Sequence, residues 1–326
     1  MSPAVRAVAA RLAHLLVVLA LVSLAATLML DLTPVDPAIV MLGEQATPEQ
    51  VAQVHAALGL DRPFLARYAN WVAGLLTGDF GTSYRTKVDV LDAILAALAV
   101  TGELIVLSLL VALAVSIPIG ILTAHHRDDW FDRLWVVVSS ALVSCPPFVS
   151  ALVLVFVFAL LARDWPVHFP ATGWTAFTAD PLDNLWHAAL PVVTLALVLV
   201  PNFSRVLRSD LVATLDDDFV LFAKAKGLPM RRVLLRHALR PSSLSLVTVA
   251  GISIGQLMGG AVVVEVLFGL PGLGQLLVNA ITLNDLPLVQ GAVVFIAAVY
   301  VAANAAVDLC YRVLDPRLRV AHGVVA

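Results

Sequence analysis

The stretch LIVLSLLVALAVSIPIGILTA, residues 104–124, holds no charged residue along its whole length. A helix of about 20 apolar residues is long enough to cross the hydrocarbon core of a bilayer. Polar residues do not recur at every second position, as they would in the strands of a membrane barrel. The stretch therefore predicts a membrane-spanning α-helix.

Five further runs lack Asp, Glu, Lys and Arg over similar lengths. The chain as a whole is 60% hydrophobic and only 13% charged, whereas about 25% charged residues is usual for a soluble domain. We therefore expect an all-α membrane protein with six transmembrane helices. The additional runs are 12–30, 134–162, 185–204, 241–264 and 286–307.

The first run could be the apolar core of a signal peptide, because Arg6 and Arg11 precede it. Its apolar length exceeds the usual 7–15 residues of such a core, and no clear small-residue cleavage site precedes Asp31. We interpret it as a retained first span.

The positive charges predict which loops face the cytoplasm. With six spans, both termini lie on the same side as the loops 125–133 and 205–240, and this side carries most of the 20 Lys and Arg residues. Positive residues collect on the cytoplasmic side, so we expect cytoplasmic termini. The predicted parts are a cytoplasmic N-terminus with the first span at 1–30, an extracytoplasmic insert at 31–98, a five-helix core at 99–312 that includes a cytoplasmic loop at 209–241, and a cytoplasmic tail at 313–326.

The insert contains residues that typically begin and end short helices. Thr47-Pro48-Glu49-Gln50 predicts a capped helix start, and Gly59 predicts its end. A second helix is expected at 63–77, followed by a turn in GDFGTSY, 78–84. Within the third span, Cys145-Pro146-Pro147 predicts a kink or break, because proline supplies no backbone donor.

The cytoplasmic loop contains FAKAKGLPMRRVLLRHALRP, residues 222–241. Acidic residues at 216–218 predict a helix start, Gly227 predicts its end, and a second basic helix at 230–240 leads into the fifth span. Phe219, Phe222 and Ala223 are expected on one face. A surface helix with ordinary cytoplasmic charges is the plainer interpretation, but exposed aromatic rings favour a covering partner.

This loop resembles the cytoplasmic signature of ABC-importer permeases, which reads EAA, three residues, then glycine. Here the three positions are Leu221, Phe222 and Ala223, the glycine is Gly227, and the leading Glu is absent. Nearly the whole chain resembles the B-type subunit of oligopeptide and dipeptide permeases in the peptide/nickel family. The similar stretches are LGLDRPFLARYANWV (58–72), GDFGTSY (78–84), PIGILTA (118–124), CPPF (145–148), GGAVVVEVLFGLPGLG (259–274) and DPRLR (315–319).

The resemblance implies a type I importer fold and a permease subunit for short peptides in a bacterial plasma (inner) membrane, with nickel or glutathione as alternative cargoes. It implies a second homologous permease, two cytoplasmic ATP-binding subunits, an extracytoplasmic binding protein and membrane lipid as partners, and no nucleic acid. ATP and Mg would bind the partners, so this chain would be no enzyme and carry no cofactor. The residues expected to couple to the ATPase are Asp218, Phe219, Phe222, Ala223, Lys224, Lys226, Gly227 and Arg236.

Two other sets of residues are candidates for function. The segment 265–274 is expected to help form an outer gate, because a gate needs backbone that can rearrange. Its candidate residues are Glu265, Pro271, Gly272 and Gly274. Gly251, Gly255 and Gly259 recur every four residues, a spacing that lets two membrane helices approach closely, so we expect them at a helix–helix contact with the second permease.

Two other classes of helical membrane protein are alternatives to a permease subunit. A secondary transporter would show repeated halves and carboxylates near the bilayer midplane, and the span centres here lack Asp and Glu. An intramembrane hydrolase is suggested only by GISIG, 251–255, which fits G-x-S-x-G but lies within a span. No Walker A loop and no metal-ligand spacing occur in the sequence, so we expect no metal site.

Overall fold

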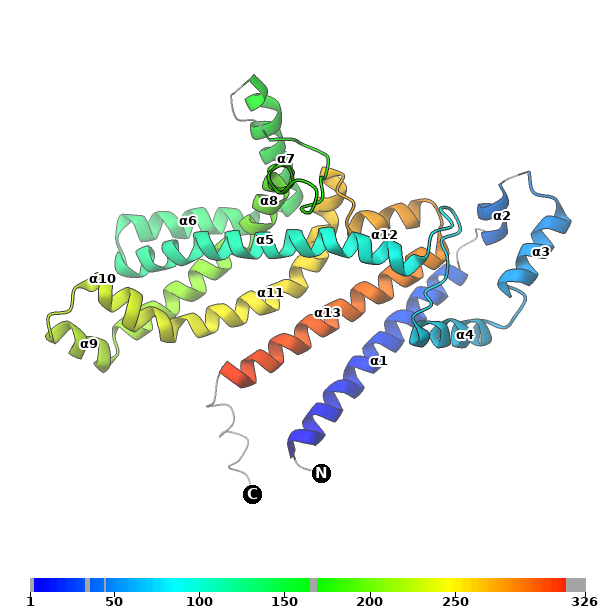
Figure 1. Ribbon diagram of the computed structural model, residues 1–326. Helices are drawn as coiled ribbons and strands as arrows, with labels where there is room; N and C mark the ends of the chain where they lie inside the picture. The colour runs from blue at the N-terminus through cyan, green and yellow to red at the C-terminus, as the bar shows by residue number, and fades with distance from the viewer. Residues whose placement is uncertain (1–2, 33–35, 44, 165–168, 315–326) are drawn as a thin grey trace. The chain divides into compact units, whose positions relative to one another are not determined.

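The computed structural model describes residues 3–32, 36–43, 45–164 and 169–314 (Figure 1). Within these ranges the chain is mostly helical, and its β-structure is an isolated bridge between Thr82 and Asp89. The chain divides into two compact units. Unit 1 comprises Met1–Thr101 and Pro271–Val301, and unit 2 comprises Gly102–Leu270 and Ala302–Ala326.

Unit 2 is built around helix α8 (Pro181–Leu215), which packs along α11 (Leu239–Phe268). Asp180 caps α8 by accepting hydrogen bonds from the backbone N–H groups of Leu182 and Asp183, at 3.0 and 3.1 Å. Buried apolar side chains occur along most of α8, so this helix forms the core of the unit. The fully buried ones include Phe203, Leu207 and Leu211.

The third predicted span is broken. Helix α6 (Trp130–Ser144) and the helical segment Pro147–Leu160 meet at 102°. Cys145 adopts an extended conformation between them, because the residue before a proline is pushed out of the helical region. The predicted break at Cys145-Pro146-Pro147 is confirmed. The second segment consists of α7 (Pro147–Leu154) and the π-helical turn η1 (Val155–Leu160), and the 3-10 turn η2 (Leu161–Asp164) follows.

Unit 1 holds α1 (Pro3–Asp31) and the short helices of the insert. The predicted capping box is present, since the Gln50 N–H donates to Thr47 Oγ1 at 3.3 Å and the Thr47 N–H donates to Gln50 Oε1 at 2.9 Å. Gly59 ends this helix with φ +64°, as predicted. The insert helices are α2 (Pro37–Leu42), α3 (Pro48–Leu58) and α4 (Phe64–Thr77).

The turn after α4 is held by Asp285, which immediately precedes α13 (Leu286–Leu314). The Ser83 hydroxyl donates to the Asp285 carboxylate, and the Tyr84 N–H donates to Asp285 Oδ1 at 3.0 Å. At the other end of α4, the Tyr68 hydroxyl lies 2.7 Å from Ser23 Oγ of α1. Unit 1 is therefore joined by polar contacts between segments that are far apart in sequence. It also includes α12 (Leu273–Thr282) and the start of α5 (Val90–His125).

The all-α membrane fold is confirmed, whereas the count of six spans remains a prediction. Within the described residues, four helices are long and apolar enough to span a bilayer, and a fifth span results if the bent pair is counted as one. The described side chains of α1 give a shorter apolar stretch, Leu15–Leu28. The four long helices are Val90–His125, Pro181–Leu215, Met230–Phe268 and Leu286–Ala305. The predicted domain limits and the cytoplasmic side of the termini, including the tail outside the described residues, also remain predictions.

Candidate functional site

The basic loop of unit 2 forms a short helix, α9 (Asp218–Ala225), directly after α8. Gly227 has φ +75°, and its N–H donates to the carbonyl of Lys224 at 2.9 Å. A left-handed residue at this point ends a helix, and glycine adopts that conformation without steric cost. The predicted helix end at Gly227 is confirmed.

The two sides of α9 differ from the expected pattern. Val220 and Ala223 are buried, with 0% and 7% of their surface exposed, whereas Phe219 and Phe222 are 48% and 62% exposed. At 3.6 residues per turn, Ala223 lies next to Val220 as well as next to Phe219. The expectation that Ala223 shares an accessible face with the two rings is therefore wrong, because α9 packs this residue against its own chain at η3 and α8.

Positive charges surround the exposed rings. Lys226 Nζ lies 4.5 Å from the centroid of the Phe222 ring, and Lys224 and Arg236 are exposed. Among the described residues, these three cations form no ion pair. At the end of α8, Arg127 Nη1 lies 3.3 Å from Asp216 Oδ2, which puts the loop 125–133 at the same end of unit 2 as the basic loop. The result is an aromatic surface bordered by cations that have no ion-pair partner in the described part of the chain.

A continuous helix connects this surface to α11. It runs through α10 (Met230–Arg232) and the π-helical turn η3 (Val233–Ala238). The hydroxyls of Thr214 and Ser242 lie 2.9 Å apart and join the end of α8 to the start of α11. The prediction of a second basic helix leading into the fifth span is confirmed, although its π-helical turn was not anticipated.

An ion pair between the buried carboxylate of Asp132 and the partly exposed guanidinium of Arg208 joins α6 to α8. Arg208 donates to both carboxylate oxygens of Asp132, with Nε 2.6 Å from Oδ1, and the Asp128 N–H donates to the same carboxylate at 3.1 Å. Sequence analysis treated Arg208 only as a cytoplasmic charge and passed over Asp132. The available signal was a carboxylate just before one apolar run and an arginine just after another, at span ends on the same predicted side.

Hydroxyl groups extend this contact along the two helices. Arg205 donates to Ser139 Oγ from Nη2 at 3.1 Å and to Ser140 Oγ at 3.2 Å. Trp135 Nε1 donates to Ser204 Oγ at 2.9 Å. The first segment of the broken span is therefore attached to α8 by charged and polar contacts in addition to apolar packing.

The predicted gate residues fall into both units. In unit 2, Glu265 is fully buried near the end of α11, and Gly269 ends the helix with φ +63°. In unit 1, Gly272 precedes α12, and the Leu273 N–H donates to Thr101 Oγ1 at 2.8 Å. Pro271 is exposed and Gly274 is buried. A role in gating remains a prediction.

The three glycines of α11 do not share one surface. Gly255 is buried, Gly251 is half-buried and Gly259 is exposed. A Cβ atom added at Gly259 would meet no atom within 4 Å. Positions four apart drift by about 40° around a helix, so the outer members of the set face different surroundings. The surroundings of Gly259 within the chain therefore leave room for another helix.

Comparison with known proteins gives matches over almost the whole chain. Residues 116–320 match the family described as binding-protein-dependent transport system inner membrane component, and residues 4–105 match its N-terminal family. A peptide transport system permease protein of Brucella abortus is 37% identical over 309 residues, which cover 95% of this chain and 97% of that protein. The dipeptide transport system permease protein DppB of Escherichia coli K12 is 34% identical over 88% of this chain and 90% of its own.

Proposed function

Because the chain belongs to the family of binding-protein-dependent transport system inner membrane components, we propose that it is a membrane permease subunit of an ATP-driven importer of short peptides. The names of its relatives support this cargo, since they include peptide and dipeptide permeases. Nickel and glutathione are the alternatives within the same type of transporter.

The exposed aromatic surface of α9 is the observation that carries the coupling role. We propose that Phe219 and Phe222 insert into a cleft on a cytoplasmic ATP-binding subunit. Each ring is about half exposed, so its further burial would stabilise the contact by about 1 kcal/mol. Lys224, Lys226 and Arg236 would attract an acidic rim, with a smaller contribution because such pairs stay hydrated.

The remaining partners follow from the same proposal. A second homologous permease completes the pathway, two cytoplasmic subunits bind ATP and Mg, and an extracytoplasmic binding protein delivers the peptide to the outer side. This chain forms half of the pathway and makes or breaks no covalent bond. The segment 265–274 is assigned to the outer gate within this scheme.

Movement of α9 would reach the membrane helices by two routes. One route runs through η3 into α11, which forms a continuous helix with it. The other runs through α8, whose Arg208 is held by Asp132 of α6. Because both routes start where Val220 and Ala223 fix α9 to its own chain, displacement of the exposed rings would move α8 and α11 together.

A cysteine in place of Phe222 tests the contact directly. In the assembled transporter, the Phe222→Cys chain should crosslink to an ATP-binding subunit, and Phe222→Asp should abolish uptake of a radiolabelled tripeptide while membrane insertion stays normal. Leu221→Asp is the matched control, because Leu221 is also exposed, at 51% against 62% for Phe222, but projects from a different side of α9. If the crosslink is absent and Phe222→Asp imports at the wild-type rate, α9 does not contact the ATPase.

A further inference from the structure

Helix α4 of the insert has an environment that the charge pattern does not predict. It is 14 residues long, about 21 Å of helix. This is too short to cross the hydrocarbon core of a bilayer, which takes about 20 residues. The sequence therefore places α4 in a part of the chain outside the membrane, but its contacts and its exposed side indicate otherwise.

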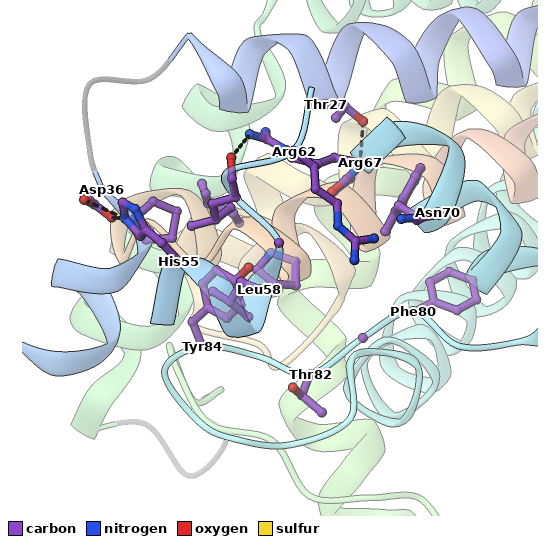
Figure 2. Close-up of a pocket in the computed structure, with 18 residues that line it drawn as sticks. Thr27, Asp36, His55, Leu58, Arg62, Arg67, Asn70, Phe80, Thr82 and Tyr84 are labelled. Atoms are coloured by element: carbon purple, nitrogen blue, oxygen red, sulfur yellow. Dashed lines mark hydrogen bonds and ion pairs between the residues drawn. The ribbon is translucent and has the colours of Figure 1, made fainter. Parts of the chain in front are cut away.

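Two sides of α4 have surroundings supplied by unit 1 itself. One side carries a row of aromatic rings, in which the ring centroids of Phe64 and Tyr68 are 6.4 Å apart and those of Tyr68 and Trp71 are also 6.4 Å apart. A second side carries Arg67 and Asn70, which line a cavity within unit 1 (Figure 2). Neither of these sides needs a further partner.

The third side of α4 is apolar and exposed. Leu65 is 72% exposed and Leu76 is 85% exposed. Ala69 and Ala73 are exposed as well, and at 3.6 residues per turn these four residues form one line along the helix, the α4 stripe. None of the four side chains has a polar group. A surface helix normally places charged and polar residues on the side that faces water, so the α4 stripe is unsuited to water.

The preceding helix of the insert, α3, shows the usual arrangement. Its exposed residues include Glu49, Gln50 and Gln53, whereas Val51 and Val54 are partly buried. The two helices follow one another in the same insert. The α4 stripe is therefore a particular feature of α4 and does not follow from the hydrophobic composition of the whole chain.

Contacts with α1 indicate the depth at which α4 lies. The Tyr68 hydroxyl is 2.7 Å from Ser23 Oγ and 3.3 Å from the carbonyl oxygen of Ala20. Ala20 is eleven positions before Asp31, the last residue of α1, which is about 16 Å along the helix. The headgroup region of a bilayer is about 5–8 Å thick on each side. With α1 as the first span, Tyr68 meets it below the headgroups.

We propose that α4 is an interfacial helix of the outer leaflet, held there by contact between the α4 stripe and lipid acyl chains. An amphipathic helix in this position buries its apolar side about 5–10 Å into the boundary between headgroups and acyl chains. Leu21 of α1 lies between Ala20 and Ser23 in sequence and is 60% exposed, so α1 offers lipid an apolar surface at the same depth. The proposal goes beyond the transport function, because it holds for any cargo.

Fluorescent labels on single cysteines test the lipid contact. Cys145 and Cys310 are replaced by alanine, and an NBD label is attached to Leu65→Cys or Leu76→Cys in the full chain in lipid nanodiscs. We expect blue-shifted emission that is lost when the lipids carry a doxyl group on the fifth acyl carbon and that resists quenching by iodide. Ala57→Cys, at an exposed position of α3, is the matched control and should be quenched by iodide alone.

Three results would overturn the proposal. Iodide quenching at Leu65→Cys and Leu76→Cys as strong as at Ala57→Cys would place the α4 stripe in water. An absence of quenching by either agent would mean that protein covers the stripe. Doxyl quenching that disappears when the complete transporter is assembled would mean that a partner subunit occupies this side of α4.

Two introduced charges test whether the α4 stripe holds the helix in the bilayer. With the label on Ala69→Cys, the double substitution Leu65→Asp and Leu76→Asp should abolish doxyl quenching and introduce iodide quenching, because a charged side chain is costly among acyl chains. Gln53→Asp adds a charge to α3 and should leave the label unchanged. Doxyl quenching that survives both charges would overturn the α4 stripe as the anchor.

Discussion

The contact between α6 and α8 and the surface of α9 lie in the same unit. They differ in whether their charged and apolar groups are buried or exposed. At the first, the carboxylate of Asp132 is buried, and Arg208 of the same chain pairs with it. At the second, two phenylalanine rings are exposed and no described part of the chain covers them. The first region is complete within the chain, whereas we propose that a partner covers the second.

Contacts of the first kind stabilise the folded chain, whereas exposed side chains of the second kind are available to contact another molecule. A buried charge without its partner is costly, so the α6–α8 pair has to be satisfied in the folded chain. Exposed rings cost the isolated chain little, because single exposed apolar residues are normal. We therefore expect substitutions in the first region to change folding and those in the second to change assembly and transport.

The largest effect should follow loss of the buried carboxylate. Asp132→Asn leaves Arg208 with a weakened partner in a largely buried site and should destabilise the chain by about 3 kcal/mol. Arg127→Gln is the control, since it removes an exposed pair with Asp216 that contributes at most about 1 kcal/mol. The measurement is the free energy of unfolding in mixed micelles. Similar losses for the two variants would mean that the α6–α8 pair does not fix unit 2.

The α9 surface should respond through binding instead. Phe219→Ala and Phe222→Ala should each weaken association with the ATP-binding subunit by about fivefold to tenfold, since each ring still has half its surface to bury. Unfolding of the isolated chain should be unchanged. Titration of the purified subunit into the chain in nanodiscs measures this. A drop in chain stability equal to the loss in binding would erase the contrast between the regions.

The glycines of α11 extend the comparison to the membrane helices. Gly259→Leu should change the free energy of unfolding by less than about 1 kcal/mol, because open space surrounds that position, yet it should reduce the yield of complex with the second permease. Gly255→Leu should instead destabilise the chain itself, because Gly255 is buried. Purified complex and unfolding are measured for both. Full assembly of Gly259→Leu would show that this face meets only lipid.

The smallest effect concerns Asp36 and His55 in unit 1, a partly exposed pair in which His55 Nε2 lies 2.8 Å from Asp36 Oδ1. Burial acts to raise the pKa of Asp36, but its hydrogen bonds with His55 and Ala38 outweigh that effect. The folded-state pKa of Asp36 lies below its ordinary value of 3.8, so its contribution to stability is complete above that value and is lost as pH falls through the lower folded-state pKa. Asp36→Asn should therefore lower stability at pH 6 and lose less of it than wild type on acidification below pH 4. Thermal unfolding of the full chain checks this. Parallel pH profiles would show that Asp36 does not stabilise the folded chain through His55.

Local sequence signals predicted the helices and most of their ends. Runs without charge predicted the long helices, because a bilayer admits little else. Glycine and proline restrict or free their own backbone, so the local sequence was enough to predict the break at Cys145 and the helix end at Gly227. The caps of α3 were equally local, since Thr47 and Gln50 bond across one turn.

Contacts between distant segments were not predictable in the same way. Periodicity grouped Ala223 with the two rings, but which side of α9 is buried depends on where η3 and α8 lie. The Asp132–Arg208 pair joins residues 76 positions apart, and no local rule pairs them. Residues of α1, the insert and α13 line one pocket in unit 1, and they come together only in the folded chain.

The direction of the basic loop depends on how the π-helical turn η3 closes its hydrogen bonds. A π-helical turn closes its hydrogen bonds one residue later than an α-helical turn, so the six residues Val233–Ala238 contain one more than regular geometry requires. If all six closed as ordinary α-helical turns instead, the helix would lengthen by about 1.5 Å and everything before it would rotate by about 100°. The aim of Phe219 and Phe222 would then change although neither residue had been touched. The way one helical turn closes, rather than either side chain, therefore sets the direction in which the two rings point.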